Sequence, residues 1–159
     1  SLSTISAQAL STTDIASLEA KNISYYTTVG SKAMVQGGKV SGGEWIDTIR
    51  FRDWLKTEIQ SKVMNLFLGL PKVPFTDQGI ALVQNAVIDA LEEGVRAGGI
   101  VQDASSEDGE AEQSYTVTVP RAADLDAATR KSRKLTGVTW TANLAGALIA
   151  AKISGTLNY

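Results

Sequence analysis

The chain has 159 residues, 43% of them hydrophobic, and a formal net charge of -2. This length suits one domain with a real core, because single domains commonly hold roughly 100 to 200 residues. The weakly acidic balance offers no general attraction to nucleic acid or to anionic membranes. Histidine and cysteine are absent, which excludes Ser-His-Asp and Cys-His nucleophilic sites, the usual zinc sites and a disulfide framework.

The first elements are a helix and a hairpin. Residues 1–10 lack the charged-then-apolar order of a signal peptide, and we expect residues 1–11 to be a linker or a truncated arm of a longer protein. Thr12 or Thr13 is expected to cap a helix. The β-branched and aromatic run 23–29 then predicts a strand paired with residues 33–36.

Two long amphipathic helices are predicted next. The first runs from about residue 44 to Leu68, and the second from a cap at Thr76 to Gly98. The first helix clusters on one side Trp45, Ile49, Leu55, Ile59, Val63, Leu66 and Phe67. Arg52 and Lys56 fall on that same side, so they must snorkel, meet a carboxylate or lie at an interface, because burying an unpaired charge is costly.

Charge is segregated in the C-terminal half. Residues 103–113 hold five acidic residues and no basic one, which predicts an acidic surface loop. Residues 115–119 alternate as a strand, and residues 122–134 are expected to form one short helix. That helix ends in a basic cluster, which we define as Arg130, Lys131, Arg133 and Lys134. Cations in the last turn of a helix interact favourably with the helix dipole. The cluster therefore either stabilises its own helix only or binds a partner.

The last twenty-five residues carry one charge, Lys152, and read as two strands. Val138, Trp140 and Ala142 alternate with polar residues, as in a strand with one buried face. The final strand is an edge that either closes the domain's own sheet or pairs with another chain. Its residues of interest are Ile149, Ala151, Ile153, Gly155, Leu157 and Tyr159. The whole pattern predicts a single α+β domain over 1–159, with a mixed β-sheet packed by two long helices.

No stretch carries a convincing catalytic or cofactor motif. The glycine-rich stretch 37–43 lacks the first glycine of a P-loop, and the stretch from Asp103 lacks the glycine that an EF-hand needs in sixth place. Glu44, Asp47 and Asp53 could supply a carboxylate pair for glycoside hydrolysis, but charges on a long helix are usually its solvated face. We therefore expect no enzyme activity, no cofactor and no metal site.

A set of ordered segments resembles the contractile-tail sheath proteins of myophages and related injection machines. The segments are GGEWID at 42–47, DWLKTEIQ at 53–60, PFTDQGI at 74–80, GVTW at 137–140, LAGA at 144–147 and ISGTL at 153–157. Pro120 and the basic helix through Arg133 complete a pattern similar to the sheath C-terminal domain.

The resemblance implies a structural part of a virion tail, assembled in the cytoplasm of the host bacterium. Sheath subunits of that family form six-fold rings around a tail tube and exchange terminal arms that add strands to neighbouring sheets. Contraction then drives the tube through the target envelope without a cofactor. By this resemblance we expect strand exchange at the final strand and tube contact at the basic cluster, with no nucleic acid and no membrane insertion.

Two other functions stay open from the residues alone. One is a small adaptor or binding module that captures a partner peptide on its sheet edge. The other is an enzyme that uses carboxylates alone. Hollow striated tubes in electron micrographs of the full-length parent would indicate a sheath rather than an adaptor.

Overall fold

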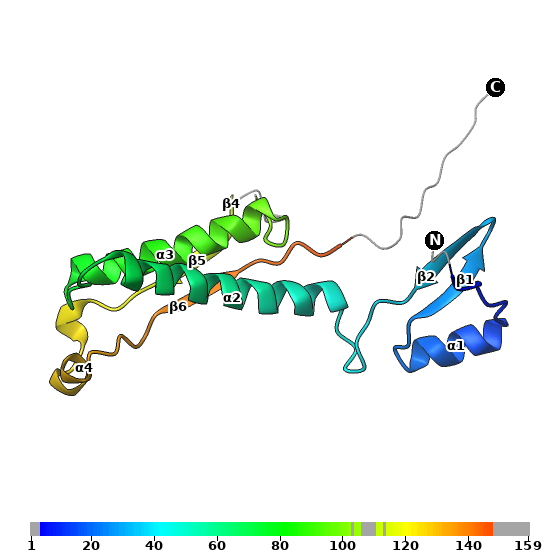
Figure 1. Cartoon of the computed structure of the whole chain (residues 1–159), viewed down its shortest axis with the longest axis horizontal. Coiled ribbons are helices and arrows are strands. Elements are labelled where there is room, and N and C mark those ends of the chain that lie inside the picture. The colour runs from blue at the N-terminus through cyan, green and yellow to red at the C-terminus, as the bar shows by residue number, and fades with distance from the viewer. Residues whose placement is uncertain (1–3, 103, 106–110, 113, 148–159) are drawn as a thin grey trace, which may run out of the picture. The chain divides into compact units, whose positions relative to one another are not determined.

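The computed structural model describes residues 4–102, 104–105, 111–112 and 114–147. The chain divides into two compact units, Ser1–Phe51 and Arg52–Tyr159, and each is described by itself (Figure 1). The expectation of a single domain stays a prediction, as does the role of residues 1–11.

The N-terminal unit begins with helix α1, Thr12–Ala20. Its N-cap is Ser11 and not the predicted Thr12 or Thr13, because the extended Ser11 forms a capping box with Asp14. The Ser11 hydroxyl accepts from the Asp14 N–H, and the Asp14 carboxylate accepts from the Ser11 N–H at 3.1 Å. The helix ends at Ala20 with Lys21 as its C-cap, and the next residue, Asn22, is left-handed with φ of 55°.

The predicted hairpin of this unit is confirmed. Strands β1, Tyr25–Val29, and β2, Lys32–Gln36, are antiparallel. Gly30 allows the tight turn with φ of +62°, a value that suits glycine. On the outer side of β1, Gln8 N donates to the Tyr26 carbonyl at 3.1 Å, and the buried Thr27 hydroxyl donates to the Gln8 carbonyl at 2.9 Å.

The two long helices are also confirmed. Helix α2 spans Ile46–Gly69 and α3 spans Asp77–Arg96, capped as predicted by Thr76, whose hydroxyl accepts from the Gly79 N–H. Helix α3 is amphipathic, and one stripe of its side chains is buried. This stripe supplies most of the core. The core of the described chain comprises Leu55, Ile80, Val83, Ala86, Val87, Ala90, Leu91 and Ile100. None of the described helices combines the length and apolar character that a membrane crossing requires.

The predicted inward face of α2 is buried only in part. Leu55 is 3% exposed, but Trp45 is 38% and Phe67 is 52% exposed, so the expectation that both pack inward is wrong. The part of the chain that the structure describes buries Leu55 in the middle of this face and leaves Trp45 and Phe67 at its two ends exposed to solvent. Arg52 and Lys56 are exposed, and Arg52 lies 3.5 Å from the Asp53 carboxylate, so neither charge is buried.

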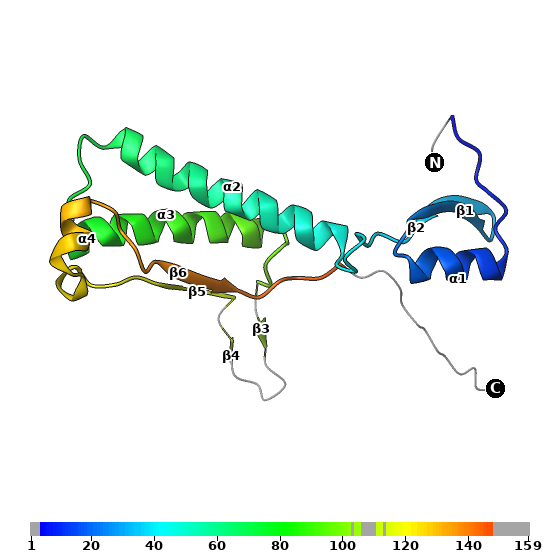
Figure 2. The same ribbon diagram turned by 90° about the horizontal axis from the view of Figure 1, so that it is seen from below.

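The strands of the C-terminal unit form antiparallel pairs. Strand β5, Tyr115–Thr118, pairs with β6, Thr139–Ala142, and the pair lies along α3 (Figure 2). Strand β3, Ala104–Ser105, pairs with β4, Ala111–Glu112, so the ends of the predicted acidic loop form a short ladder. The α+β class is confirmed. Within the described ranges the strands make three two-stranded antiparallel sheets in place of one mixed sheet.

The prediction of one continuous helix over residues 122–134 is wrong, because the structure has two shorter helical segments there. A 3₁₀ turn, η1, spans Ala122–Asp124, and helix α4 spans only Ala127–Ser132. The break has a local cause, because Leu125 is extended and Asp126 caps a new helix by accepting from the Thr129 N–H. The basic cluster therefore straddles the end of a short helix.

Candidate assembly surface

An apolar groove lies between α2, α3 and β6. It has a volume of about 640 Å³. Helix α3 forms its floor, α2 one wall, and β6 with the preceding loop the other wall. The lining residues are Ile59, Val63, Phe67, Val83, Val87, Arg133, Lys134, Leu135, Thr136, Val138 and Trp140. The groove is thus apolar with two cations on its rim.

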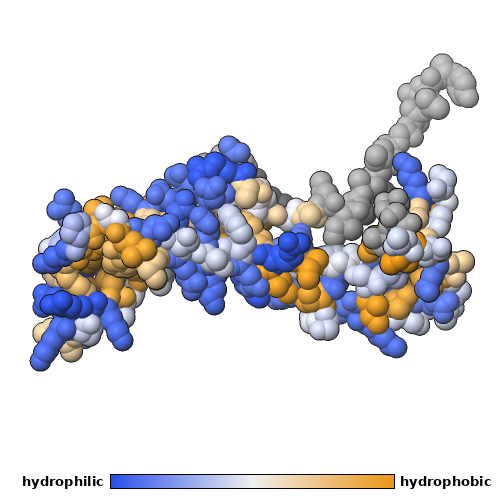
Figure 3. Space-filling model, viewed as in Figure 1, coloured by the Kyte–Doolittle hydropathy of each residue, from blue (hydrophilic) through white to orange (hydrophobic). Residues whose placement is uncertain are grey.

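Two aromatic residues in the walls of the groove remain exposed. Trp140 is 40% exposed although its strand pattern predicts a buried face, and Phe67 is 52% exposed. Met64 and Leu68, on the same last turns of α2, are 58% and 77% exposed. Figure 3 shows hydrophobic side chains gathered where α2 ends and α3 begins. Large contiguous apolar patches on protein surfaces commonly mark interaction sites, so this end of the unit is a candidate assembly surface.

Strand β6 offers an open edge beside this groove. In an antiparallel pair, opposite residues alternate between hydrogen-bonded and non-hydrogen-bonded pairs. Asn143 N donates to the Ser114 carbonyl at 3.0 Å, so Asn143 belongs to a hydrogen-bonded pair. By alternation, Ala142 and Trp140 belong to non-hydrogen-bonded pairs. Their backbone N–H and C=O groups therefore point away from β5. No described strand pairs with that edge.

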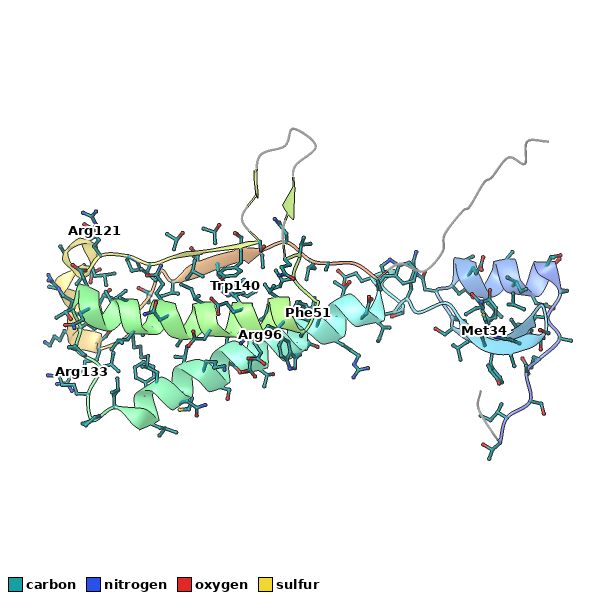
Figure 4. All side chains as sticks on the ribbon, turned by 90° about the horizontal axis from the view of Figure 1, so that it is seen from above. Met34, Phe51, Arg96, Arg121, Arg133 and Trp140 are labelled. Atoms are coloured by element: carbon teal, nitrogen blue, oxygen red, sulfur yellow. The ribbon has the colours of Figure 1, made fainter. Side chains whose placement is uncertain are left out.

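The basic cluster divides into two pairs. Arg133 and Lys134 line the groove, whereas Arg130 and Lys131 belong to the last turn of α4 and do not line it. All four side chains are exposed. Figure 4 shows Arg121 and Arg133 at the same end of the C-terminal unit. The sequence spacing does not reveal this division, because it depends on where the helix stops.

Arg133 has an unusual backbone conformation. Its φ is 56° and ψ is 27°, the left-handed region that glycine favours at a helix end. A residue with a Cβ pays roughly 1 to 2 kcal/mol there. Strain of this kind is often kept where a side chain has a function, and here it directs the chain so that Arg133 and Lys134 reach the rim of the groove.

The predicted strand-exchange residues lie outside the described part of the chain. Ile149, Ala151, Ile153, Gly155, Leu157 and Tyr159 all fall within 148–159. The assignment of inter-subunit strand exchange to them stays a prediction.

The three candidate carboxylates lie at the surface of the protein. Glu44, Asp47 and Asp53 are exposed, and Asp53 lies beside Arg52. Across the described residues, no three acidic side chains are grouped so as to hold a metal ion.

Comparison with known proteins identifies the family. A family model described as "E217 tail sheath protein gp31-like, C-terminal domain" matches residues 46–157. The match begins at the first residue of α2 and includes the groove, the β5–β6 pair and the basic cluster. A search of curated proteins gave no match. Because the family model covers more than half of the chain, the chain belongs to this family, and its role is that of a structural subunit in the sheath of a phage tail.

Proposed function

We propose that this chain is the C-terminal core of a contractile sheath subunit, which joins its neighbours by inter-subunit strand exchange and surrounds a tail tube. The observation that carries the proposal is the open edge of β6 beside an exposed apolar groove. Main-chain hydrogen bonds at such an edge give affinity, and side chains that enter the groove give specificity. Among the described residues, β5 is the one strand that pairs with β6, which leaves the other edge of β6 available for a further strand.

In this proposal, the final segment of the chain is the arm that one subunit donates. Ile149, Ala151 and Ile153 alternate along a β-branched segment whose only charge is Lys152. Subunits linked in this way form six-fold rings, and contraction of the stacked rings drives the tube outward. Assembly takes place in the host cytoplasm, and the finished sheath is part of the virion tail.

Deletion of residues 149–159 in the full-length parent tests the arm. We expect the deleted protein to fold but to form no hollow striated tubes in electron micrographs. Ile153→Pro removes one ladder donor and should act in the same direction, while Ile153→Val keeps the donor and serves as the control. Normal tubes from the deletion would contradict strand exchange through this segment. A wild-type parent that binds peptides but never polymerises would favour the adaptor function.

We also propose that the basic cluster contacts acidic groups on the tube exterior. Exposed ion pairs are worth only about 0 to 1 kcal/mol each and are screened by salt, so such a contact can break on contraction. Arg130 and Lys131 are the cleaner pair to test, since neither lines the groove. Arg130→Glu/Lys131→Glu should reduce co-sedimentation with purified tubes and leave the melting temperature unchanged. A lower melting temperature with unchanged co-sedimentation would show that the two cations only complement their own helix.

A further inference from the structure

We propose that the groove between α2, α3 and β6 binds a free long-chain carboxylate while the subunit is unassembled. The alkyl chain lies along the groove, and the carboxylate is held by Arg133 and Lys134. The ligand class is thus an anionic amphiphile, bound as a single molecule from solution. This site goes beyond the proposed sheath function, because it gives the assembly surface a small-molecule ligand.

The groove has the size and the lining of a small-molecule site. Such sites commonly measure about 300 to 1,000 Å³ and are mostly apolar with a few polar groups. This groove measures about 640 Å³, and its lining is aliphatic or aromatic except for Arg133, Lys134 and Thr136. A ligand that fits it is therefore mostly apolar, with a polar group at one end.

The groove is elongated, because successive turns of α2 line it. Ile59, Val63 and Phe67 follow one another at intervals of four residues, so this wall extends over about 12 Å. Figure 4 shows Arg133 at the end of the C-terminal unit that holds α4, and Trp140 farther along α3. A cationic end followed by an apolar length fits an extended alkyl chain with one head group.

A smaller hollow continues the groove toward the start of α3. It measures about 90 Å³ and shares Phe67, Val83, Arg133 and Leu135 with the groove. Arg133 therefore lies where the two hollows meet, with apolar surface on both sides. A carboxylate bound there is partly shielded from water, which strengthens its attraction to the guanidinium group.

The two cations specify the charge of the head group. Within the described ranges neither Arg133 nor Lys134 has a carboxylate partner, since the ion pairs there involve Arg52, Lys62 and Arg96. The lining of the groove contains no acidic residue. A carboxylate can accept two parallel hydrogen bonds from one guanidinium group, so this end of the groove favours a carboxylate over a neutral or cationic head group.

Burial of the alkyl chain supplies the main driving force for binding. Phe67 is 52% and Trp140 is 40% exposed, and Ile59, Val63 and Val138 are half-buried. Removal of apolar surface from water is favourable in proportion to the area covered. Affinity should therefore rise with chain length from octanoate to dodecanoate, and acetate should not bind.

The groove is also part of the surface at which neighbouring subunits join in the proposed function. A carboxylate bound there covers the apolar walls of the free subunit and competes with assembly. The ligand is therefore a reversible inhibitor of tube formation. This consequence alone rests on the proposed function.

Dodecanoate below its micelle concentration is the probe for binding to the full chain. Trp45→Phe/Trp54→Phe leaves Trp140 as the only tryptophan, and its emission reports occupancy because it lines the groove. We expect a saturable change of emission with dodecanoate. Dodecyltrimethylammonium carries the same chain on a cationic head group and should bind about tenfold or more weakly. Equal affinity for the two head groups would overturn the proposal.

Matched charge variants place the head group. Arg133→Gln/Lys134→Gln should weaken dodecanoate binding about fivefold or more. Arg130→Gln/Lys131→Gln makes the same change of net charge at residues that do not line the groove, and should leave the affinity unchanged. An unchanged melting temperature checks that each variant folds. An equal loss of affinity in both variants would assign the effect to net charge and contradict a head-group site at the rim.

Matched apolar variants place the alkyl chain. Phe67→Ala removes part of the groove wall and should weaken dodecanoate binding severalfold. Leu68→Ala is the control, because Leu68 is 77% exposed and does not line the groove. If Phe67→Ala binds dodecanoate as tightly as Leu68→Ala does, the chain does not lie in this groove.

Vesicles distinguish a free amphiphile from a membrane surface. Phosphatidylglycerol vesicles present anionic head groups and alkyl chains within a bilayer, and we expect the protein not to float with them in a density gradient. Flotation with the vesicles in the absence of binding to monomeric dodecanoate would overturn the proposal in favour of membrane binding.

Tube assembly separates this inference from the proposed function. Saturating dodecanoate should reduce the number of striated tubes that the full-length parent forms. If tubes form equally well with and without it, the sheath function stands and competition at the groove is wrong. If the parent forms no tubes under any condition, the proposed function fails, and the Trp140 titration alone decides whether the carboxylate site exists.

Discussion

Asp77, in the first turn of α3, accepts a hydrogen bond from the backbone N–H of Ala122, with 2.6 Å between Oδ1 and the nitrogen. The two residues are 45 positions apart in the sequence. The bond fixes the chain where it leaves β5 and enters η1, because the first N–H groups of a helical turn have no partner within the turn. It thereby helps to place α4 and the basic cluster at the N-terminal end of α3.

Asp77→Ala should lower the free energy of unfolding by about 1 kcal/mol, since it leaves the Ala122 N–H without its charged acceptor. Asp77→Asn is the matched control, because the amide oxygen still accepts a hydrogen bond and should retain part of that free energy. Urea unfolding followed by circular dichroism measures both. If both variants unfold like the wild type, the bond does not anchor this corner.

Gly79→Ala should destabilise the C-terminal unit by about 1 to 3 kcal/mol, because overpacking forces the backbone to shift. A Cβ at this buried position would overlap the carbonyl oxygen of Pro74. Gly69→Ala is the control, since a Cβ there meets no atom within 4 Å. Thermal unfolding of the two variants should differ clearly. Equal melting temperatures would show that the connector before α3 yields without cost.

Arg133→Gly should raise the free energy of unfolding by about 0.5 to 1 kcal/mol, because glycine adopts the left-handed conformation without the Cβ penalty but loses more chain entropy on folding. Arg133→Ala removes the same charge and keeps the penalty, so it should not be stabilised. Chemical unfolding of the pair separates backbone strain from charge. A gain in both variants would assign the effect to charge alone.

Acid should weaken α4 through Asp126. The Thr129 backbone N–H donates to its carboxylate and lowers the pKa of Asp126. A carboxyl with a lowered folded-state pKa contributes stability above its unfolded pKa, about 3.9, and that contribution is lost as the pH falls through the folded pKa. Hydrogen bonds from the Ser11 side chain and from Arg96 likewise lower the pKa of Asp14 and Glu93.

Asp126→Asn keeps a good N-cap without a titrating group. The melting temperature of the variant should therefore fall less steeply than that of the wild type as the pH decreases from about 5 to below 4. Circular dichroism melts across this range measure the difference. Identical pH profiles would mean that the cap contributes nothing to acid stability.

Local sequence signals determined most of the secondary structure. The stripe Ile80, Val83, Val87 and Leu91 predicts the buried face of α3, and Thr76 marks its start, because helical period and capping are properties of neighbouring residues. The β1–β2 hairpin and the strands that became β5 and β6 follow from β-branched alternation for the same reason. The resemblance to sheath proteins likewise needed only the order of segments along the chain, and the family match confirms it.

Only the tertiary structure decided what those elements leave uncovered. Trp140 and Phe67 carry the pattern of buried residues, yet they stay exposed because no described segment packs against the groove between β6 and α2. The division of the basic cluster, with Arg133 on the rim and Arg130 outside it, depends on the left-handed turn that ends α4. Burial, edge pairing and charge placement arise from contacts between residues far apart in the chain, and a local pattern cannot fix which of these surfaces is left for another subunit.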